Sequence, residues 1–472
     1  MLLREQRQKF LETNQGAAVA LVDLLIDQQE AARAFSWTNR ATAADVIDYT
    51  RLVEAKVSNP EAQKLIDDWN QIYQQIQALN GQLETNPPNR DMISAQLKQL
   101  WEKNRELEAE MLRRFPEVAE LFETQPEDMA KLQAALPAGT VAIQPVLLTN
   151  TSNVPNNIAL FVVGKDRVTV TKVSINPQEF DEVLAKYRGK LENPVSDQYG
   201  KYQRQLYDWL IRPIEGEIAA AAPQQLAIIP TGKLRYIPFE TLYDQETGQY
   251  LLEKYPIHYL TRISPRALGR PRVQGERRVL ALGNPVPVPP QNLPAAEEEA
   301  KNIHQTISGE LYIRDAATLG TFRDKSPGFS LVHLATHGCF RWEGCDKLGM
   351  PGNTLLFANK ETFNLADTAR LGLDNTDIIA LSACETAIST VTNGAEIAGI
   401  AYLFEQAGVR SVMASLWNVE DKAGKDVMVR FYANLQQGMT KAEALRQAKL
   451  AQIKVQPHPF YWSPFILIGD GG

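Results

Sequence analysis

Cysteines and long apolar runs are scarce in this chain, and each scarcity excludes a class of protein. The 472 residues include 3 cysteines, too few for the disulfide framework of a small secreted domain. The most apolar run near the start, AAVALVDLLI, contains Asp23 and is too short to span a bilayer. The opening residues, MLLREQRQKF, carry charge from Arg4 onward, unlike a secretory signal peptide. We therefore expect a soluble, cytoplasmic protein in a reducing compartment.

Basic residues are also too few for a general nucleic-acid binder. The chain has 49 Lys and Arg against 56 Asp and Glu, a formal net charge of -7, whereas nucleic-acid binders normally carry a basic footprint. A hydrophobic content of 44% is ordinary for a globular protein, and the length allows two or three domains. We predict that the chain binds neither nucleic acid nor a membrane. The oligomeric state does not follow from the sequence.

The first 135 residues have the apolar spacing of helices. Two runs separated by a breaker at Pro87-Pro88 repeat apolar residues at spacings of three, four or, once, seven positions: Leu65, Trp69, Ile72, Ile76, Leu79 and Leu83, then Ile93, Leu97, Leu100, Leu107 and Met111. This pattern predicts an antiparallel helical hairpin. The apolar stripe is expected to join the two helices, although it could also dock a partner.

From about residue 138 the pattern changes to short β-rich runs, then to apolar runs that alternate with helical segments. The predicted strands are TVAIQPVLL, NIALFVVG, RVTVTKVSI, LAIIP, RVLALGNP, SLVHLATHG, DIIALSAC, VRSVMASLW and PFILIG. Buried strands separated by helices indicate an α/β fold, a mainly parallel sheet covered on both faces. In such sheets, ligands bind at the carboxyl ends of the strands.

Two predicted strands end in residues suited to nucleophilic catalysis. SLVHLATHG delivers His337 and DIIALSAC delivers Cys384, both at the carboxyl edge of the sheet. An imidazole near a thiol can take its proton and later give one to a leaving amine. Gly338 would let a substrate carbonyl approach the backbone, and its N–H with that of Cys384 could bind an oxyanion. Taken singly, such a Cys or His is more often a packed core residue.

Two other chemistries fit these residues less well. His333, His337, Cys339 and Cys345 fall within thirteen residues, as zinc ligands can. On an extended strand, however, the two histidines would be roughly 13 Å apart, too far for one ion. PTGK at 230–233 lacks the upstream glycine of a phosphate-binding loop and favours a turn. We expect no metal and no other cofactor. Cys339 either packs at the end of its strand or has a redox role.

Several long motifs in one order resemble the CHAT domain, a family of caspase-like cysteine peptidases associated with TPR repeats. They are LAIIPTGKLRYIPFETLYD, NLPAAEEEAKNI, HLATHG, LSACETA, GAEIAGIAYLFEQAGVRSVMASLWNVED, FYANLQQGMTKAEALRQAKL and HPFYWSPFILIGD. The 47 residues between His337 and Cys384 are similar to the caspase spacing. The resemblance implies that these two residues are the catalytic dyad and that the fold is a caspase-hemoglobinase sandwich. Ala387 departs from the glycine that is common in the family.

The resemblance also implies an organisation and a function. Residues 1–135 would be a helical region like the tail of a TPR array. Residues 136–472 would be the CHAT domain, with a β-meander and helices at 136–220 and the catalytic core at 221–472. The implied function is a cysteine endopeptidase that cleaves specific protein partners through a thioester intermediate in regulated proteolysis or signalling, with a regulatory partner bound through the N-terminal helices. The alternative is a non-catalytic scaffold of the same fold.

Residues around the predicted dyad suggest which side chain precedes the cut. In caspase-like folds, the pocket for this side chain is lined by the strand that carries the nucleophile and by the next strand. The candidate pocket residues are Ser382, Glu385, Trp417, Glu420 and Asp421. A carboxylate at the pocket floor, with Asp421 as the selector, predicts a preference for Arg or Lys. Without it, Ser382 and Trp417 would favour a medium apolar residue. Asp421 could instead cap the helix that it opens.

Overall fold

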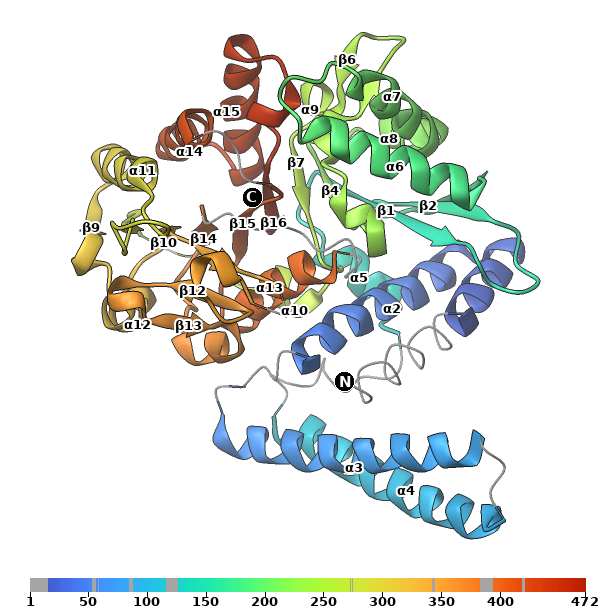
Figure 1. The fold of residues 1–472 in the computed structure, drawn as a ribbon. Coiled ribbons are helices and arrows are strands. Elements are labelled where there is room, and N and C mark those ends of the chain that lie inside the picture. Colours follow the sequence, from blue (N-terminus) through green and yellow to red (C-terminus); the bar gives the residue numbers. More distant parts are fainter. Residues whose placement is uncertain are drawn as a thin grey trace.

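The central feature of the molecule is one large twisted sheet. The computed structural model describes residues 16–472 except 53–56, 58, 85–87, 116–125, 272, 274, 342–343, 383–393 and 418–420. Within the described residues, eleven strands form this sheet (Figure 1). In spatial order they are β3 (Val168–Ser174), β2 (Asn157–Val163), β1 (Thr140–Leu148), β4 (Gln225–Ile228), β7 (Ile257–Tyr259), β16 (Phe465–Gly469), β15 (Ser411–Ser415), β14 (Ile378–Leu381), β10 (Leu331–Ala335), β8 (Val279–Gly283) and β9 (Gly309–Ile313).

The strands are mainly parallel, as the alternation of apolar runs and helices predicted. Antiparallel pairing joins β1 to β2, β2 to β3, and β15 to β16, while the other neighbouring pairs are parallel. The predicted meander and the predicted core therefore share one continuous sheet, because β1 pairs with β4. Strands β7 and β9 were not predicted. The first has three residues, and the second is a half-buried edge strand.

Helices cover both faces of the sheet, as expected for buried parallel strands. In β10, Leu331 packs with residues of α11, α14 and α15, whereas its neighbour Val332 packs in the core that contains α12 and α13. In β1, Val141 and Ile143 share a core with α6 and α7, and Ala142 packs with α2 and α5. These helices span α2 (Ala31–Leu52), α5 (Met129–Ala135), α6 (Pro177–Leu191), α7 (Tyr199–Leu210), α11 (Pro294–Thr306), α12 (Leu319–Lys325), α13 (Ala395–Gln406), α14 (Asp421–Gln436) and α15 (Lys441–Val455).

The N-terminal helices divide into two parts. Residues 16–27 and α2 pack on the meander, where Val22, Leu25 and Phe35 are buried against β-strand residues such as Phe161. The predicted hairpin is confirmed as α3 (Pro60–Glu84) and α4 (Arg90–Arg114), which lie side by side away from the sheet in Figure 1. Its apolar stripe joins the two helices, in clusters that include Ile72, Ile76, Ile93 and Leu97. No helix among the described residues has the length and apolar character of a membrane span.

Beyond the carboxyl end of β10, a small second sheet begins. It consists of β11 (Gly338–Cys339), β12 (Thr354–Leu356) and β13 (Thr362–Asn364). The run SLVHLATHG is therefore two strands, and His337 lies between them. Gly338 and Cys339 form this new strand directly after His337.

Candidate active site

The two segments that carry the predicted dyad leave adjacent strands at the same edge of the sheet. Strands β10 and β14 are parallel neighbours, and Leu334 is paired with Leu381. His337 follows the first of these residues by three positions, and Cys384 follows the second by three positions. Cys384 itself, with Glu385 and Ala387, lies outside the described residues. The register thus directs both chain segments to one edge, where ligands bind in parallel sheets.

His337 is held by its backbone and by its ring. Its carbonyl accepts a hydrogen bond from the Leu356 N–H at 2.9 Å, and the preceding Thr336 hydroxyl donates to the Leu356 carbonyl at 2.7 Å. The ring Nε2 lies 3.1 Å from the backbone carbonyl oxygen of Gln291. Because a carbonyl oxygen only accepts, Nε2 carries the proton, and in the neutral ring Nδ1 is the basic nitrogen. His337 is 7% exposed, so this tautomer is fixed inside the protein.

Gln291 is a member of the site that the sequence did not indicate. It follows β8 in the segment that leads to α11, and only 6% of it is exposed. Its side-chain amide donates to the carbonyl of Leu348 at 2.9 Å. The contact with His337 is made by a backbone carbonyl, which every residue type possesses. No residue-type signal could therefore have revealed it.

The space beside Gly338 is occupied by another residue of the same chain. A Cβ atom at this position would meet the ring of Phe340 at 2.5 Å, well inside van der Waals contact. A larger residue here would therefore require the ring of Phe340 to move. The prediction that Gly338 lets a substrate carbonyl approach the backbone stays a prediction. The backbone of Gly338 pairs with Leu355 of β12. The oxyanion role of its N–H stays a prediction.

Cys339 and Cys345 form a disulfide, which the sequence analysis did not predict. Two of the three cysteines are paired, although they make no framework. The pair packs in a buried apolar cluster with Val286, Leu348, Met350 and Leu356. A paired sulfur is not available as a thiolate ligand, so the alternative zinc site loses two of its four candidates.

Of the two remaining zinc candidates, His333 has polar partners of its own. Its ring nitrogens lie 3.1 Å from a carboxylate oxygen of Glu299 and 3.3 Å from the hydroxyl of Tyr432, and the side chain is fully buried. Those partners come from α11 and α14, on the face opposite to Val332. Among the described residues, no group of three or more His, Cys, Asp or Glu side chains is placed to hold a metal ion.

The predicted specificity residues are placed only in part. Ser382 is half-buried directly after β14. Trp417 is 6% exposed, and its indole N–H donates to the carbonyl of Phe460 at 3.1 Å, so most of its surface already packs in the core. Asp421 opens α14, which is the position of its alternative capping role. Glu420 lies outside the described residues, and the position of the Asp421 side chain is not described.

Comparison with known proteins agrees with this arrangement. Residues 200–470, more than half of the chain, match the CHAT domain. This chain belongs to the CHAT domain family. Tetratricopeptide repeat protein 28 of Mus musculus is 24% identical over 324 residues, and the Homo sapiens protein is 26% identical over 321 residues. Each match covers 57% of this chain but 13% of the relative, so the chain spans a small part of the length of these relatives.

The CHAT domain also resembles a solved structure. The Saccharomyces cerevisiae separase–securin complex at 3.0 Å resolution gives a TM-score of 0.51 over 93% of this chain and 40% of that chain, with 10% sequence identity. A likeness at this identity concerns the fold alone. The caspase-like α/β fold implied by the sequence motifs is thereby confirmed.

A tyrosine missed by the sequence reasoning binds the start of α13, directly after the undescribed residues 383–393. Tyr236 belongs to a short 3-10 helix, η3 (Gly232–Tyr236), within the PTGKLRY run. Its hydroxyl accepts from the N–H of Gly394 at 2.7 Å and donates to Glu396 at 3.2 Å. The guanidinium of Arg188, from α6, lies 4.2 Å from the centre of its ring. Residues 383–393 therefore connect β14 to a firmly held point at the start of α13.

The N-terminal helix α2 contacts α13, the helix that follows residues 383–393. Val46 of α2 packs with Ala398 and Tyr402 of α13. The side chain of Asn39 donates to the carbonyl of Ile263 at 3.0 Å and accepts from its N–H at 2.8 Å. This two-point contact fixes α2 to the loop after β7. The CHAT domain and the N-terminal helices are thus joined by buried packing and by hydrogen bonds.

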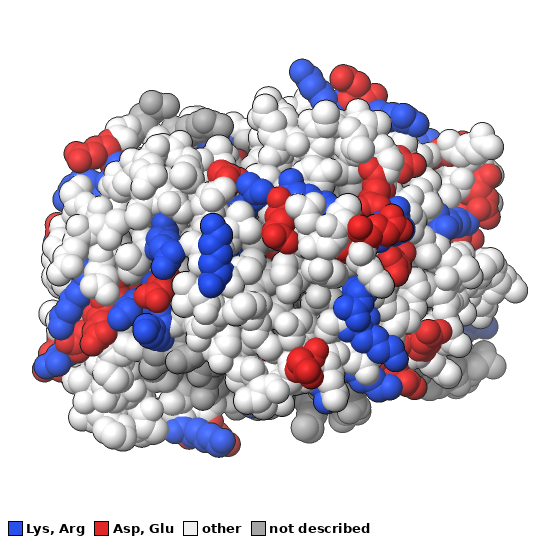
Figure 2. Space-filling view, turned by 90° about the horizontal axis from the view of Figure 1, so that it is seen from above, with Lys and Arg blue, Asp and Glu red and all other residues white. Residues whose placement is uncertain are grey.

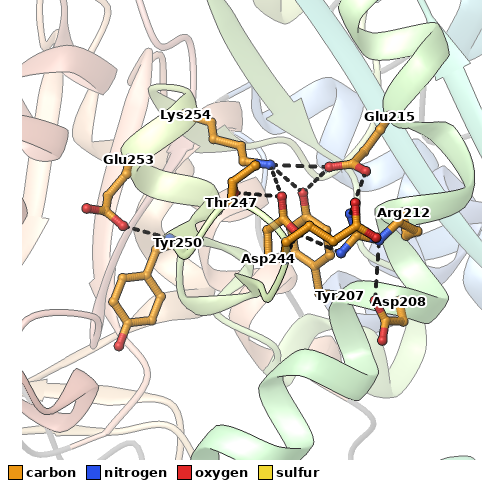
Figure 3. A network of polar contacts seen from close by, with 10 residues as sticks. Tyr207, Asp208, Arg212, Glu215, Asp244, Thr247, Tyr250, Glu253 and Lys254 are labelled. Carbon is orange, nitrogen blue, oxygen red and sulfur yellow. Dashed lines mark hydrogen bonds and ion pairs between the residues drawn. The ribbon is translucent and has the colours of Figure 1, made fainter.

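A separate polar cluster is shown in Figure 3. Asp244 is its centre, and its two carboxylate oxygens lie 2.6 Å from Arg212 and 2.6 Å from Lys254. Tyr207 and Glu215 complete the cluster around Lys254. Burial alone would raise the pKa of Asp244, but hydrogen bonds from Lys254 and Arg212 outweigh it and hold this pKa well below its usual range. Opposite charges are matched here, so we interpret this cluster as structural.

Proposed function

We propose that this CHAT protein is a cysteine endopeptidase that cleaves specific protein partners. The thiolate of Cys384 attacks a peptide carbonyl, and His337 acts first as base and then as acid at Nδ1. The leaving amine departs with that proton, and a thioester remains on the sulfur. Water then attacks the thioester with His337 as base, which releases the carboxylate and restores the thiol.

One observation carries the proposal: His337 is held in a single tautomer at the edge that receives the Cys384 segment. The bond from Nε2 to the Gln291 carbonyl directs the basic nitrogen, Nδ1, away from that carbonyl. A catalytic base usually has a third group that orients it, and a backbone carbonyl can take this part. The paired register of Leu334 and Leu381 supports the approach of the two segments.

The test uses a peptide that carries a thiol-directed electrophile, with intact mass as the readout. Cys339 and Cys345 are joined in a disulfide, so Cys384 is the single thiol that can take the label. We expect one adduct per chain, lost in Cys384→Ala. We also expect Cys384→Ala to abolish cleavage of protein substrates while the fold persists. Absence of any adduct across a peptide library would contradict the proposal.

The residue before the cut is proposed to be Arg or Lys, selected by Asp421. A carboxylate in the pocket would form a charge-assisted hydrogen bond with either side chain. Glu385, Glu420 and Ser382 are the other proposed pocket residues. A positional-scanning peptide library decides this point. A preference for Asp, or an unchanged preference for Arg and Lys in Asp421→Ala, would exclude Asp421 as selector.

We propose further that a regulatory protein acts through the N-terminal helices. The contact of Val46 with Ala398 and Tyr402 supports this route, because α13 begins directly after the segment that carries Cys384. Figure 2 shows basic and acidic side chains mixed over the face seen from above, a surface that suits protein partners rather than nucleic acid. Crosslinking of the full chain to captured proteins, mapped by mass spectrometry, would locate the contact.

A non-catalytic scaffold is the competing function, and the hairpin favours it. On α4, Met92 and Trp101 are 64% and 40% exposed, as residues of a docking surface would be. The two functions differ in a measurable way. A peptidase forms a covalent adduct and releases fragments from a partner, whereas a scaffold binds the same partner and leaves it intact. A pull-down with Cys384→Ala, compared with the unaltered chain, separates them.

A further inference from the structure

The disulfide and Gln291 form a closed path of contacts around His337. From His337, the ring Nε2–H donates to the Gln291 carbonyl, and the Gln291 amide donates to the Leu348 carbonyl. Leu348 in turn donates its N–H to the Cys345 carbonyl at 2.9 Å. The disulfide then joins Cys345 to Cys339, two residues after His337. Each step is a hydrogen bond or a covalent link, so the path returns to His337.

The parts of this path are buried and packed. Cys339 has no exposed surface, Cys345 is 8% exposed and Gln291 is 6% exposed. Cys345 also makes a pair of backbone hydrogen bonds with Met350, which holds the turn that carries Leu348. A buried side-chain amide needs its partner, because an unpaired one costs about 1 to 3 kcal/mol. The position of the Leu348 carbonyl therefore fixes the position of Gln291.

We propose that Gln291 is the positioning residue for His337 and that the Cys339–Cys345 disulfide makes this positioning dependent on redox state. With the disulfide formed, the turn at Leu348 is tied to β11, and Gln291 holds the imidazole. When it is reduced, the turn is released from β11, the Leu348 carbonyl shifts, and Gln291 no longer keeps its carbonyl opposite Nε2. The catalytic consequence rests on the proposed peptidase function, whereas the structural link does not.

The chemistry of the switch is thiol–disulfide exchange with a dithiol reductant. A thiolate of the reductant attacks the sulfur of Cys345, the more exposed of the two, and Cys339 leaves as a thiolate that takes up a proton. The second thiol of the reductant attacks the mixed disulfide and releases Cys345. Two electrons and two protons pass to the protein, and the reductant becomes a cyclic disulfide. An oxidised dithiol reverses both steps.

The structural test is made in a Cys384→Ala chain, where Cys339 and Cys345 are the two remaining cysteines. Histidine labelled with nitrogen-15 reports the Nε2–H proton of His337, assigned by its loss in His337→Asn. We expect a protected N–H signal before reduction and its loss or shift after dithiothreitol raises the intact mass by two hydrogens. Adding Cys339→Ser and Cys345→Ser should give the reduced spectrum without any reductant. A signal unchanged by both treatments would overturn the proposal.

Gln291→Met tests whether Gln291 transmits the effect. Methionine keeps the length and apolar volume of the side chain but cannot donate to Leu348. We expect the reduced-type signal even while the disulfide is intact. Gln144→Met is the matched control, because Gln144 is also buried but donates to Thr42 on α2. A Gln291→Met signal that matches the oxidised protein, or an equal change in Gln144→Met, would refute the role of Gln291.

A kinetic test links the path to the reaction. In the chain with Cys384 intact, we expect reduction to slow labelling of Cys384 by the peptidyl electrophile by about 10- to 100-fold, since a misplacement near 1 Å can cost about 10²-fold. Re-oxidation should restore the rate, and Gln291→Met should remove the difference. An equal rate in both redox states would overturn the catalytic part. If Cys384 never takes the label while the His337 signal still responds, the peptidase proposal fails and the structural link stands.

Discussion

The Asp244 network and the surroundings of His337 hold polar side chains in place by different means. Around Asp244, charged groups are matched with opposite charges from four neighbouring elements, and hydrogen bonds depress the carboxyl pKa. His337 is held by a neutral backbone carbonyl and by the backbone of a small sheet. In the Asp244 network, the matched opposite charges stabilise one arrangement of the side chains and keep each group in its charged form. At His337, the carbonyl partner fixes the position of the Nε2 proton without adding a charge.

The largest expected effect comes from a substitution of His337 itself. His337→Ala should lower the rate of Cys384 labelling by about 10²–10⁴-fold, the usual contribution of a general acid–base group. Stopped-flow or timed intact-mass measurements at neutral pH give this rate. His333→Asn is the matched control, because this buried histidine lies four residues earlier, on β10, and contacts Glu299 and Tyr432 instead. A rate within about twofold of the unaltered chain would assign the proton transfer to another residue.

The second largest effect comes from a substitution in the Asp244 network. Asp244→Ala should lower the free energy of unfolding by about 3 kcal/mol, because it leaves Arg212 and Lys254 without their shared carboxylate. The labelling rate of Cys384 should not change. Urea unfolding followed by tryptophan fluorescence measures the first quantity.

Asp208→Ala is the control for that experiment. Asp208 reaches the same Arg212 at 3.5 Å, but its side chain is 59% exposed. Loss of such a surface pair should change the stability by about 0.5 kcal/mol or less. Equal destabilisation by the two substitutions would show that burial does not distinguish them.

A third histidine, His258, should make the stability of the protein depend on pH. Burial lowers the pKa of His258 from 6.5 to about 4, and its Nδ1–H donates to the carbonyl of Gly469 at 2.7 Å. Between these two pH values the unfolded chain binds a proton that the folded chain does not. Stability should therefore fall as the pH is lowered from 6.5 to 4.

His258→Asn should flatten this part of the pH dependence, measured as the unfolding free energy at several pH values. His304→Asn, on α11 and half-buried, controls for the loss of one imidazole. A slope that stays the same in His258→Asn would exclude His258 as the source.

The smallest effect concerns the start of α13, which follows the segment that carries Cys384. Tyr236→Phe removes the hydroxyl that accepts from Gly394 and donates to Glu396, at a cost of about 1 kcal/mol in stability. Because the segment loses an anchor, Cys384 labelling should slow by less than in His337→Ala. Tyr243→Phe, a half-buried tyrosine of β5 (Tyr243–Asp244), is the control. Full activity with normal stability in Tyr236→Phe would remove Tyr236 from the support of the site.

The sequence predicted those features that depend on local apolar pattern. The runs ending at Ala335 and Leu381 are strands, and the spacing around Ile72 and Ile93 is a hairpin. Prediction failed where the cause was a contact between distant residues. The three-residue β7 is a strand because β4 and β16 flank it, and Gln291 acts through a backbone carbonyl. The disulfide depends on a turn that brings two cysteines together, which composition does not describe.

The position of β16 has a consequence for how the chain acquires its fold during synthesis. This strand, Phe465–Gly469, joins β7 on one side to β15 on the other, and so connects the two halves of the sheet. A nascent chain that has not reached residue 465 holds five strands on one side of the gap and five on the other, within the described residues, with no strand between them. Both halves would expose unpaired edges until the last strand arrives. The segments that follow β10 and β14 therefore extend from a complete sheet only after β16 has been translated.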